Sequence, residues 1–310
     1  MPSLLDAVGR TPLVPLGRVA AGCKVPVLAK CEQLNPSGSV KDRIAVAIVD
    51  DAERRGLIHP GDTLVEATAG NTGLGLALVC AARGYRLVCV LPEKMSLDKR
   101  GALQTLGAQV IVTPNRPPGD AENFQAVAAR LATENGWFLT DQFRNPVNAL
   151  AHETTTGPEI FEQTGGELSA FVAGAGTGGT ITGVGRFLKR RLPNVRVVLA
   201  DPIGSALADW VERGELGADG PYAIEGIGAS RPPEIFDRTV IDRAERVSDE
   251  ESFAMCRRLI REEGLFVGGS AGTAVVAALR IAAGATLAGP VVVILPDAWD
   301  RYRSCKWMNA

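Results

Sequence analysis

Residues 35–43, Asn-Pro-Ser-Gly-Ser-Val-Lys-Asp-Arg, lie where a loop gives way to an amphipathic helix. The proline and glycine are typical of a turn, Ser39 is predicted to cap the helix, and apolar residues follow with helical spacing from Ile44. Lys41 then falls in the first helical turn, beside the positive end of the helix dipole, which disfavours its ammonium form. Because Schiff-base chemistry needs a neutral amine, Lys41 is the candidate reactive group. The alternative is a solvated lysine on an ordinary helix.

The composition is typical of an α/β protein. The chain has 310 residues, of which 46% are hydrophobic and 22% charged, with 35 glycines. This length suits two lobes. Lys and Arg (33) nearly balance Asp and Glu (35), and no basic block indicates a nucleic-acid partner. No apolar run approaches the roughly 20 residues of a membrane span.

The cysteines and histidines exclude several classes of site. The six cysteines form neither a C-x-x-C pair nor a framework spacing, so reduced thiols are expected. His59 and His152 are the only histidines, which argues against a histidine metal site and leaves little for a catalytic triad. The N-terminus has no signal-peptide pattern. We therefore expect a cytoplasmic protein with no bound metal.

Strands alternate with helices along most of the chain. Helices are predicted at 40–55, 71–83, 96–106, 120–135, 146–163, 180–190, 249–263 and 271–283. Strands are predicted at 25–31, 63–67, 86–91, 109–113, 137–140, 170–173, 195–200 and 291–295. The range 202–245 is predicted to be irregular. This alternation implies parallel sheets covered on both faces, in two lobes with a cleft between them.

Residues 174–180, Gly-Ala-Gly-Thr-Gly-Gly-Thr, join an apolar strand to a helix. Closely spaced glycines let backbone N–H groups approach a ligand, and a helix start favours an anion, so the segment predicts a phosphate cradle. The same glycines also satisfy G-x-G-x-x-G, and Asp201 ends the next strand where a dinucleotide fold places a ribose-binding acid. A nicotinamide enzyme is therefore an alternative, as is a purely structural turn.

Residues 68–73, Thr-Ala-Gly-Asn-Thr-Gly, form a second strand-to-helix junction. Their hydroxyls, amide and backbone N–H groups lie at a positive helix end, which suits a substrate carboxylate. The alternative is an N-cap with a flexible turn. A dinucleotide needs a single anion site for its diphosphate, so two such sites better suit a phosphorylated cofactor and an amino-acid carboxylate.

Two further glycine-rich segments each carry one polar side chain. In residues 268–272, Gly-Gly-Ser-Ala-Gly, Ser270 either caps a helix or presents its hydroxyl to a heterocycle nitrogen. In residues 225–228, Glu-Gly-Ile-Gly, the glycines beside Glu225 predict a loop that approaches a ligand or moves.

Taken in order, these motifs resemble the pyridoxal-phosphate enzymes of fold type II, the cysteine synthase and cystathionine β-synthase family. The segments that carry the resemblance are 35–43, 68–73, 142–146, 176–180 and 268–272. Several segments are more similar to cystathionine β-synthases, namely 92–96, 141–145, 201–205, 225–228 and 264–272. Cysteine synthases tend to have glutamine at the position of Glu225. Residues 152–160 do not discriminate between the two groups.

The resemblance implies a two-lobed fold similar to the tryptophan synthase β-subunit, in which each lobe is an open, twisted, mainly parallel sheet flanked by helices. A smaller, mobile substrate lobe would comprise 1–12 and 35–145, and a larger cofactor-binding lobe 13–34 and 146–310. No haem-binding or regulatory domain is expected. The resemblance also implies a homodimer.

The resemblance also assigns roles to individual residues. Lys41 would hold pyridoxal 5′-phosphate covalently. The other cofactor-binding residues would be Asn71, Gly176, Thr177, Gly178, Gly179, Thr180 and Ser270. The substrate-binding residues would be Thr68, Ala69, Gly70, Asn71, Thr72, Gln142, Glu225 and Gly226.

The implied reaction is β-replacement on serine, or an O-activated serine, by a thiol through an aminoacrylate, with Lys41 moving the protons. Because Ser270 offers the ring nitrogen a neutral hydroxyl, β-elimination is favoured over a long-lived carbanion. With homocysteine as the thiol the product is cystathionine. The alternatives are a cysteine synthase using O-acetylserine or O-phosphoserine with sulfide, a nicotinamide-dependent oxidoreductase, and a non-catalytic binding homologue, against which Lys41 argues.

Three departures from the family pattern concern the second substrate more than the cofactor. Ala69 stands where the family usually has serine, and Ala229 where cystathionine β-synthases usually have tyrosine. Asp297-Ala298-Trp299 replaces the common Asp-Ser stretch near the C-terminus.

Overall fold

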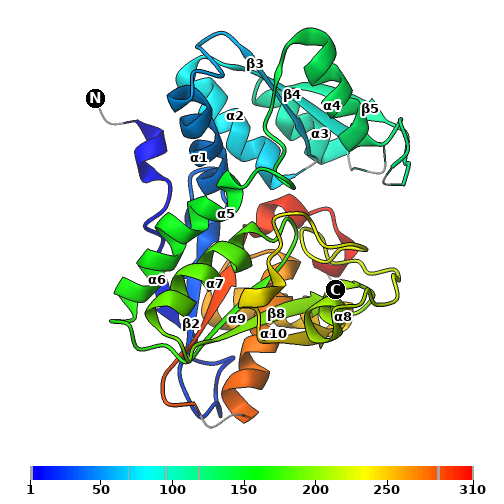
Figure 1. Ribbon diagram of the computed structural model, residues 1–310. Helices are drawn as coiled ribbons and strands as arrows, with labels where there is room; N and C mark the ends of the chain where they lie inside the picture. The colour runs from blue at the N-terminus through cyan, green and yellow to red at the C-terminus, as the bar shows by residue number, and fades with distance from the viewer. Residues whose placement is uncertain are drawn as a thin grey trace. The chain divides into compact units, whose positions relative to one another are not determined.

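The computed structural model describes residues 3–68, 70–93, 95, 97–117, 119–284 and 287–308, and the chain divides into two compact units (Figure 1). Unit 1 comprises Met1–Val8 and Asn35–Asn148, and unit 2 comprises Gly9–Leu34 and Ala149–Ala310. Over the described ranges, neither unit contains a helix with the length and apolarity needed to cross a membrane.

Unit 1 is built on a parallel sheet whose described strands have the order β5-β4-β3-β6. The strands are β3 (Thr63–Ala67), β4 (Arg86–Pro92), β5 (Gln109–Thr113) and β6 (Phe138–Leu139). The helices are α1 (Lys41–Arg54), α2 (Asn71–Arg83), α3 (Leu97–Thr105) and α4 (Phe124–Asn135), with a 3-10 turn at Leu4–Ala7. Leu64 packs with α1, α2 and α3, whereas Val65 packs with α4, because successive strand residues point to opposite faces. Both faces are therefore covered, as a parallel sheet requires.

Unit 2 is built on a second sheet, with the order β1-β2-β10-β7-β8-β9 in its described part. The strands are β1 (Leu13–Pro15), β2 (Val27–Cys31), β7 (Ala170–Gly174), β8 (Arg196–Pro202), β9 (Arg243–Val247) and β10 (Val291–Leu295). β1 is antiparallel to β2, and the other pairs are parallel. The helices are α6 (Gly157–Gln163), α7 (Gly179–Arg191), α8 (Leu207–Arg213), α9 (Asp249–Glu263) and α10 (Gly269–Gly284). Short 3-10 turns lie at Glu32–Leu34, Arg238–Val240, Trp299–Tyr302 and Lys306–Met308.

The two faces of the unit 2 sheet have separate cores. Val291 and Val293 pack with α9 and α10, while Val292 and Ile294 pack with α6, α7 and α8. The alternation along one strand again reflects the two-residue period of side-chain direction. The predicted α/β class, with mainly parallel sheets flanked by helices, is confirmed.

The range 202–245 is more regular than the sequence predicted. It contains α8, whose Leu207 and Ala208 are buried in the core, and the beginning of β9, which pairs with β8. The sequence also did not predict β1, a strand of three residues that obtains its hydrogen bonds from β2. In each case the element is stabilised by contacts with the sheet or the core, so its local sequence pattern is weak.

The predicted helix 146–163 is continuous but not uniform. It consists of α5 (Val147–Ala151), one π-helical turn (His152–Thr156) and α6. A π turn inside a helix is rare and frequently marks a functional site. The turn carries His152 in the interior of unit 2.

The helix predicted at 271–283 begins earlier, at Gly269, and so includes one glycine that the sequence placed before the helix. A Cβ atom at Gly272 would lie 1.9 Å from the carbonyl oxygen of Ser252 in α9. The two helices therefore pack backbone to backbone at this point. Tertiary packing outweighs the low helix propensity of glycine here.

Candidate active site

Lys41 is the first residue of α1. The loop before it is held in place by Asp42, the residue that follows Lys41. The Asp42 carboxylate accepts a hydrogen bond from Ser37 N at 2.6 Å and a second from the Ser37 hydroxyl. The prediction that Ser39 is the N-cap is wrong, because Val40 occupies that position in helical conformation. The Ser39 hydroxyl instead accepts a hydrogen bond from Lys41 N at 3.3 Å.

Helix α2 approaches α1 at Lys41, and the two helices lie side by side (Figure 1). A Cβ atom at Gly75 would meet the Lys41 carbonyl oxygen at 3.1 Å and the Ala45 Cβ at 3.2 Å. Asn71 begins α2 and lies one turn before Gly75 on the same helix face. The fold therefore brings Lys41 and Asn71 to neighbouring helix starts within unit 1.

The predicted carboxylate-binding residues of unit 1 converge through hydrogen bonds. The Thr72 hydroxyl donates to Gln142 Oε1 at 2.5 Å, and Gly70 N donates to Thr68 Oγ1 at 3.3 Å. The amide oxygen of Gln142 is engaged as an acceptor in the bond from Thr72. Its amide nitrogen is the donor group of the side chain and can donate to a ligand. Ala69, also predicted to bind substrate, lies outside the described residues.

Glu66 and Thr140 belong to the same cluster, although the sequence did not single them out. Glu66 Oε2 accepts hydrogen bonds from the Thr140 hydroxyl and, at 3.3 Å, from Gln142 N. Burial raises the pKa of Glu66 to about 7, and the nearby Asp141 carboxylate adds to this, while hydrogen bonding from Thr140 and from the backbone and side chain of Gln142 opposes it. The available signal was a single acidic residue within the otherwise apolar β3.

The raised pKa predicts a pH dependence of stability. Between pH 4.5, the ordinary value, and about 7, folded Glu66 keeps a proton that the unfolded chain releases, so the free energy of unfolding falls as pH rises. The substitution Glu66→Gln removes this loss. We expect the unfolding free energy of the variant, minus that of the wild type, to increase by up to about 3 kcal/mol between pH 4.5 and a pH above 7. Urea titrations measure both free energies. Glu134→Gln at an exposed site is the control, and a pH-independent difference for Glu66→Gln would contradict the prediction.

The predicted phosphate cradle of unit 2 lies at the start of α7. Gly178 precedes the helix with φ of 84°, a conformation that favours glycine. A Cβ atom at Gly176 would lie 2.3 Å from the carbonyl oxygen of Gly226. Gly228 N donates to the Ala175 carbonyl at 2.8 Å, which completes the contact. The structure thus places the 225–228 loop directly against the cradle.

Thr180, at the end of the cradle, is hydrogen-bonded to a histidine from the π turn. Its hydroxyl lies 3.2 Å from His152 Nε2, and His152 Nδ1 lies 2.9 Å from the Thr156 hydroxyl. Gly183 allows this approach, since a Cβ atom there would lie 2.1 Å from the Ala149 carbonyl oxygen. The contact between His152 and Thr180 was not anticipated from the sequence.

Ser270 is the second residue of α10 and is buried. The alternative that it caps this helix is wrong, since a cap precedes the helix and Ser270 lies inside it. A Cβ atom at Gly269 would lie 3.3 Å from the Ile224 side chain, so α10 begins beside the 225–228 loop. Among the residues that the structure describes, the Ser270 hydroxyl makes no hydrogen bond. A buried hydroxyl in this position fits a heterocycle nitrogen.

Asp201 is not placed to bind a ribose. It is fully buried at the end of β8, and its Oδ2 accepts a hydrogen bond from Ala208 N at 2.8 Å. Burial raises its pKa to about 6. Asp201 therefore stabilises the start of α8, which removes the main support for the nicotinamide alternative.

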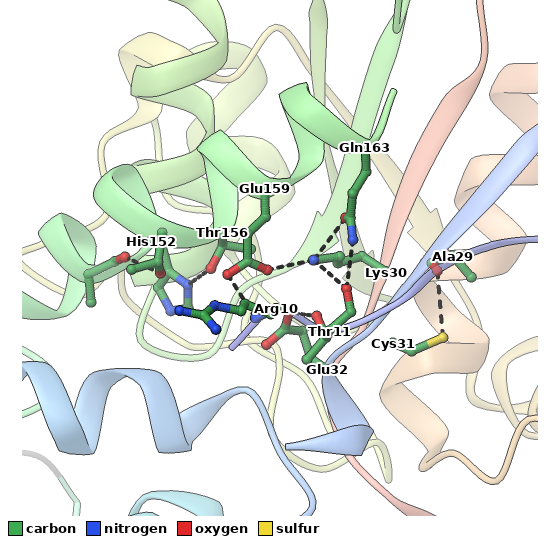
Figure 2. Close-up of polar contacts among 12 residues, drawn as sticks. Arg10, Thr11, Ala29, Lys30, Cys31, Glu32, His152, Thr156, Glu159 and Gln163 are labelled. Carbon is green, nitrogen blue, oxygen red and sulfur yellow. Dashed lines mark hydrogen bonds and ion pairs between the residues drawn. The ribbon is translucent and has the colours of Figure 1, made fainter. Parts of the chain in front are cut away.

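Another lysine, Lys30, is fully buried, and its hydrogen bonds argue against a reactive role. Figure 2 shows its Nζ atom among three acceptors: the Thr11 carbonyl at 2.7 Å, Glu159 Oε2 at 2.6 Å and Gln163 Oε1 at 2.9 Å. An ammonium group has three donors, and here each has a partner. Lys30 is therefore a structural cation that ties β2 to α6 rather than a nucleophile.

The arrangement in unit 2 fits pyridoxal phosphate. A glycine turn without space for side chains precedes a helix start, which suits a phosphate group. Ser270 offers an uncharged hydroxyl suited to the heterocycle. In unit 1 the structure brings a lysine, an asparagine and the residues predicted to bind a carboxylate to the starts of α1 and α2. Each unit thus has features that suit a pyridoxal-phosphate-dependent enzyme.

Comparison with known proteins identifies the family. The sequence pattern of the family described as "Pyridoxal-phosphate dependent enzyme" matches residues 4–297, and the chain belongs to this family. The crystal structure of O-ureido-L-serine synthase is similar, with a TM-score of 0.92, 41% identity and coverage of 100% of this chain and 96% of that chain. A variant of that enzyme with a lysine replaced by alanine, bound to O-ureido-L-serine, gives a TM-score of 0.90 at 40% identity.

Cystathionine beta-synthases are also similar to the chain. The protein of Oryctolagus cuniculus is 45% identical over 317 residues, which cover 99% of this chain and 57% of that protein. The protein of Apis mellifera is 46% identical over 307 residues, which cover 97% of this chain and 60% of that protein. The chain thus spans less than two thirds of the length of these relatives. The predicted family and its cofactor, pyridoxal phosphate, are confirmed.

Proposed function

We propose that the chain catalyses the replacement of the serine β-hydroxyl by the thiol of homocysteine, forming cystathionine. The observation that carries this proposal is the contact of the 225–228 loop with the phosphate cradle through Gly176 and Gly226. Glu225, whose side chain is exposed, directly precedes Gly226 in this loop. A carboxylate there suits the amino group of homocysteine, which sulfide lacks.

In this proposal the residues around the cofactor have the roles that the family resemblance implies. Lys41 would hold it covalently, Asn71 would bind the ring hydroxyl, and Ser270 would face the ring nitrogen. The phosphate would be bound by Gly176, Thr177, Gly178, Gly179 and Thr180. When bound, pyridoxal phosphate draws electrons from Cα of the amino acid and makes its proton acidic.

The remaining steps belong to side chains of unit 1. The substrate carboxylate would be bound by Thr68, Gly70, Asn71, Thr72 and Gln142, with the Gln142 amide nitrogen donating. Helix α2 contributes the N–H groups of its first turn. The free amine of Lys41 would remove the proton from Cα and return one to the leaving oxygen. Binding of the carboxylate by several donors fixes Cα relative to this amine.

Two other β-replacements are alternatives within the same site. A cysteine synthase would use O-acetylserine or O-phosphoserine with sulfide. The likeness to O-ureido-L-serine synthase suggests a nucleophile such as hydroxyurea, whose oxygen would join Cβ. The three activities share the residues that would bind the cofactor and differ in the nucleophile.

We expect L-serine with L-homocysteine to give cystathionine with a higher kcat/KM than O-acetyl-L-serine gives with sulfide or hydroxyurea, by mass spectrometry of the products. Glu225→Gln should lower kcat/KM for homocysteine by about tenfold, the value of a hydrogen bond to a charged group, and leave sulfide unaffected. Glu215→Gln, at a nearby exposed position, is the matched control. A higher kcat/KM with sulfide or hydroxyurea would overturn the assignment of the nucleophile.

Three further expectations from the sequence stay predictions: a homodimer, a cytoplasmic location, and a smaller lobe that closes over the substrate. Closure would exclude water from the reacting amino acid. Analytical ultracentrifugation of the purified chain would determine the oligomeric state.

A further inference from the structure

Glu66 occupies a position where a carboxylate is costly. It lies in the middle of β3 with 1% of its surface exposed, and its partner across the sheet is Cys89 of β4. Burying an acidic group in such surroundings is unfavourable unless it is hydrogen-bonded. Glu66 Oε1 has no hydrogen-bond partner among the described residues, so Oε2 makes the contacts that matter.

The hydrogen bonds to Glu66 Oε2 hold the turn at Asp141, a residue with a strained backbone. Asp141 has a φ of 48°, a left-handed conformation that is uncommon outside glycine. Glu66 Oε2 accepts from Thr140, which precedes Asp141, and from Gln142, which follows it. A single oxygen atom therefore fixes both ends of the strained turn. Strained backbone persists only where the surroundings hold it, and it is concentrated at functional sites.

The turn determines where the Gln142 side chain lies. Gln142 reaches the Thr72 hydroxyl at the start of α2, while its carbonyl oxygen accepts from the Asn148 side chain at 2.8 Å. Thr140 has a second acceptor, the Val65 carbonyl at 3.3 Å. Within the described residues, Glu66 is the acceptor for Gln142 N. Without Glu66 this buried N–H group would lose its partner, and the turn would relax.

We propose that Glu66 is a positioning residue for the substrate carboxylate, which aims the Gln142 amide by holding the turn at Asp141. This inference rests on the proposed function, in which Gln142 binds that carboxylate. Two other titratable groups face Glu66: Asp141 from the same turn and Cys89 from β4. Both are acids, so neither supplies a cation that would make Glu66 part of an ion pair. Its role is to accept hydrogen bonds.

The test measures the dissociation constants of L-serine and O-acetyl-L-serine from the change in cofactor absorbance of the loaded enzyme. Glu66→Leu, which removes the acceptor, should weaken amino-acid binding by at least about tenfold. Glu66→Gln retains an acceptor oxygen and should change binding by less than about threefold. Leu64→Val is the matched control, because it opens a small cavity on the same face of β3 without touching the turn.

A double substitution separates positioning from general destabilisation. If Glu66 acts through Gln142, Glu66→Leu combined with Gln142→Ala should bind the amino acid as weakly as Gln142→Ala alone. Independent, multiplying effects would overturn the proposal. So would unchanged binding in Glu66→Leu, or a loss in Leu64→Val equal to that in Glu66→Leu.

A third variant keeps the proposal testable if Glu66→Leu does not fold. Glu66→Asp retains the carboxylate but withdraws it from Gln142 N, and it should weaken binding by at least about fivefold. Binding equal to that of the wild type would overturn the proposal. If the wild type binds neither amino acid, the proposed function itself fails and the role of Glu66 fails with it. If the wild type binds one of them and the Glu66 variants bind it equally well, only the positioning role is overturned.

Discussion

Replacing Lys41 with alanine is expected to lower kcat/KM by at least about 10³-fold, because one amine would supply both the covalent cofactor link and the proton transfer. Borohydride reduction followed by peptide mass mapping should locate the cofactor on Lys41 in the wild type and find no adduct in the variant. The position of Lys41 at the start of α1, beside the first turn of α2, is the structural reason for this expectation.

Two other lysines provide the controls for Lys41. Lys24→Ala at an exposed position should retain both activity and the adduct. Lys30→Met should lower stability by removing the cation that Glu159 neutralises, and it should leave the adduct on Lys41. Turnover and a cofactor adduct that persist in Lys41→Ala would overturn the assignment of the reactive lysine.

Replacing Gly176 with alanine is expected to weaken pyridoxal phosphate binding by at least about tenfold, since an overpacked contact typically costs about 1–3 kcal/mol. The added methyl group would lie 2.3 Å from the Gly226 carbonyl oxygen, a backbone atom that side-chain rotation cannot move. Either the cradle or the 225–228 loop must shift. Fluorescence titration of the apoenzyme with the cofactor measures the change in affinity.

The matched control for Gly176 is Gly101→Ala in α3. A Cβ atom at Gly101 would meet nothing within 4 Å, so cofactor affinity should be unchanged. Gly176→Ala should also lower kcat/KM for homocysteine more than its loss of cofactor affinity explains, because the loop carries Glu225. Normal cofactor affinity in Gly176→Ala would contradict the placement of the phosphate in this cradle.

Local sequence patterns were sufficient to predict most of the helices and strands. Five elements have the bounds that the sequence predicted: β3, α2, β5, α9 and β10. Each has a strong local signal. Helix α2 ends at Gly84 in the left-handed conformation typical of a helix end, and α9 begins with a capping box at Ser248. Short strands and turns such as β1 and the π turn carry no comparable local signal.

Two of the buried acidic residues, Asp201 and Glu66, show where local reasoning ends. Asp201 fits a dinucleotide motif by its spacing, yet its carboxylate is used within the fold to hold α8. Glu66 attracted no prediction, yet it accepts hydrogen bonds from Thr140 and Gln142, which lie 74 and 76 residues further along the chain. Spacing in a sequence identifies a residue type at a strand end, but it does not reveal which atoms that residue meets.

The sequence by itself determined the α/β class, the glycine-rich junctions between strands and helices, the candidate lysine, and the family with its cofactor. The class, the junctions and the lysine follow from hydrophobic period and glycine placement, which are local properties of the chain, whereas the family and its cofactor follow from the resemblance of the motifs to known enzymes. Only the tertiary structure decided that the 225–228 loop packs on the phosphate cradle, that His152 reaches Thr180, and that Glu66 holds the turn before Gln142. These contacts join residues distant in sequence, and they depend on backbone approaches and burial that exist only once the sheets and helices have packed.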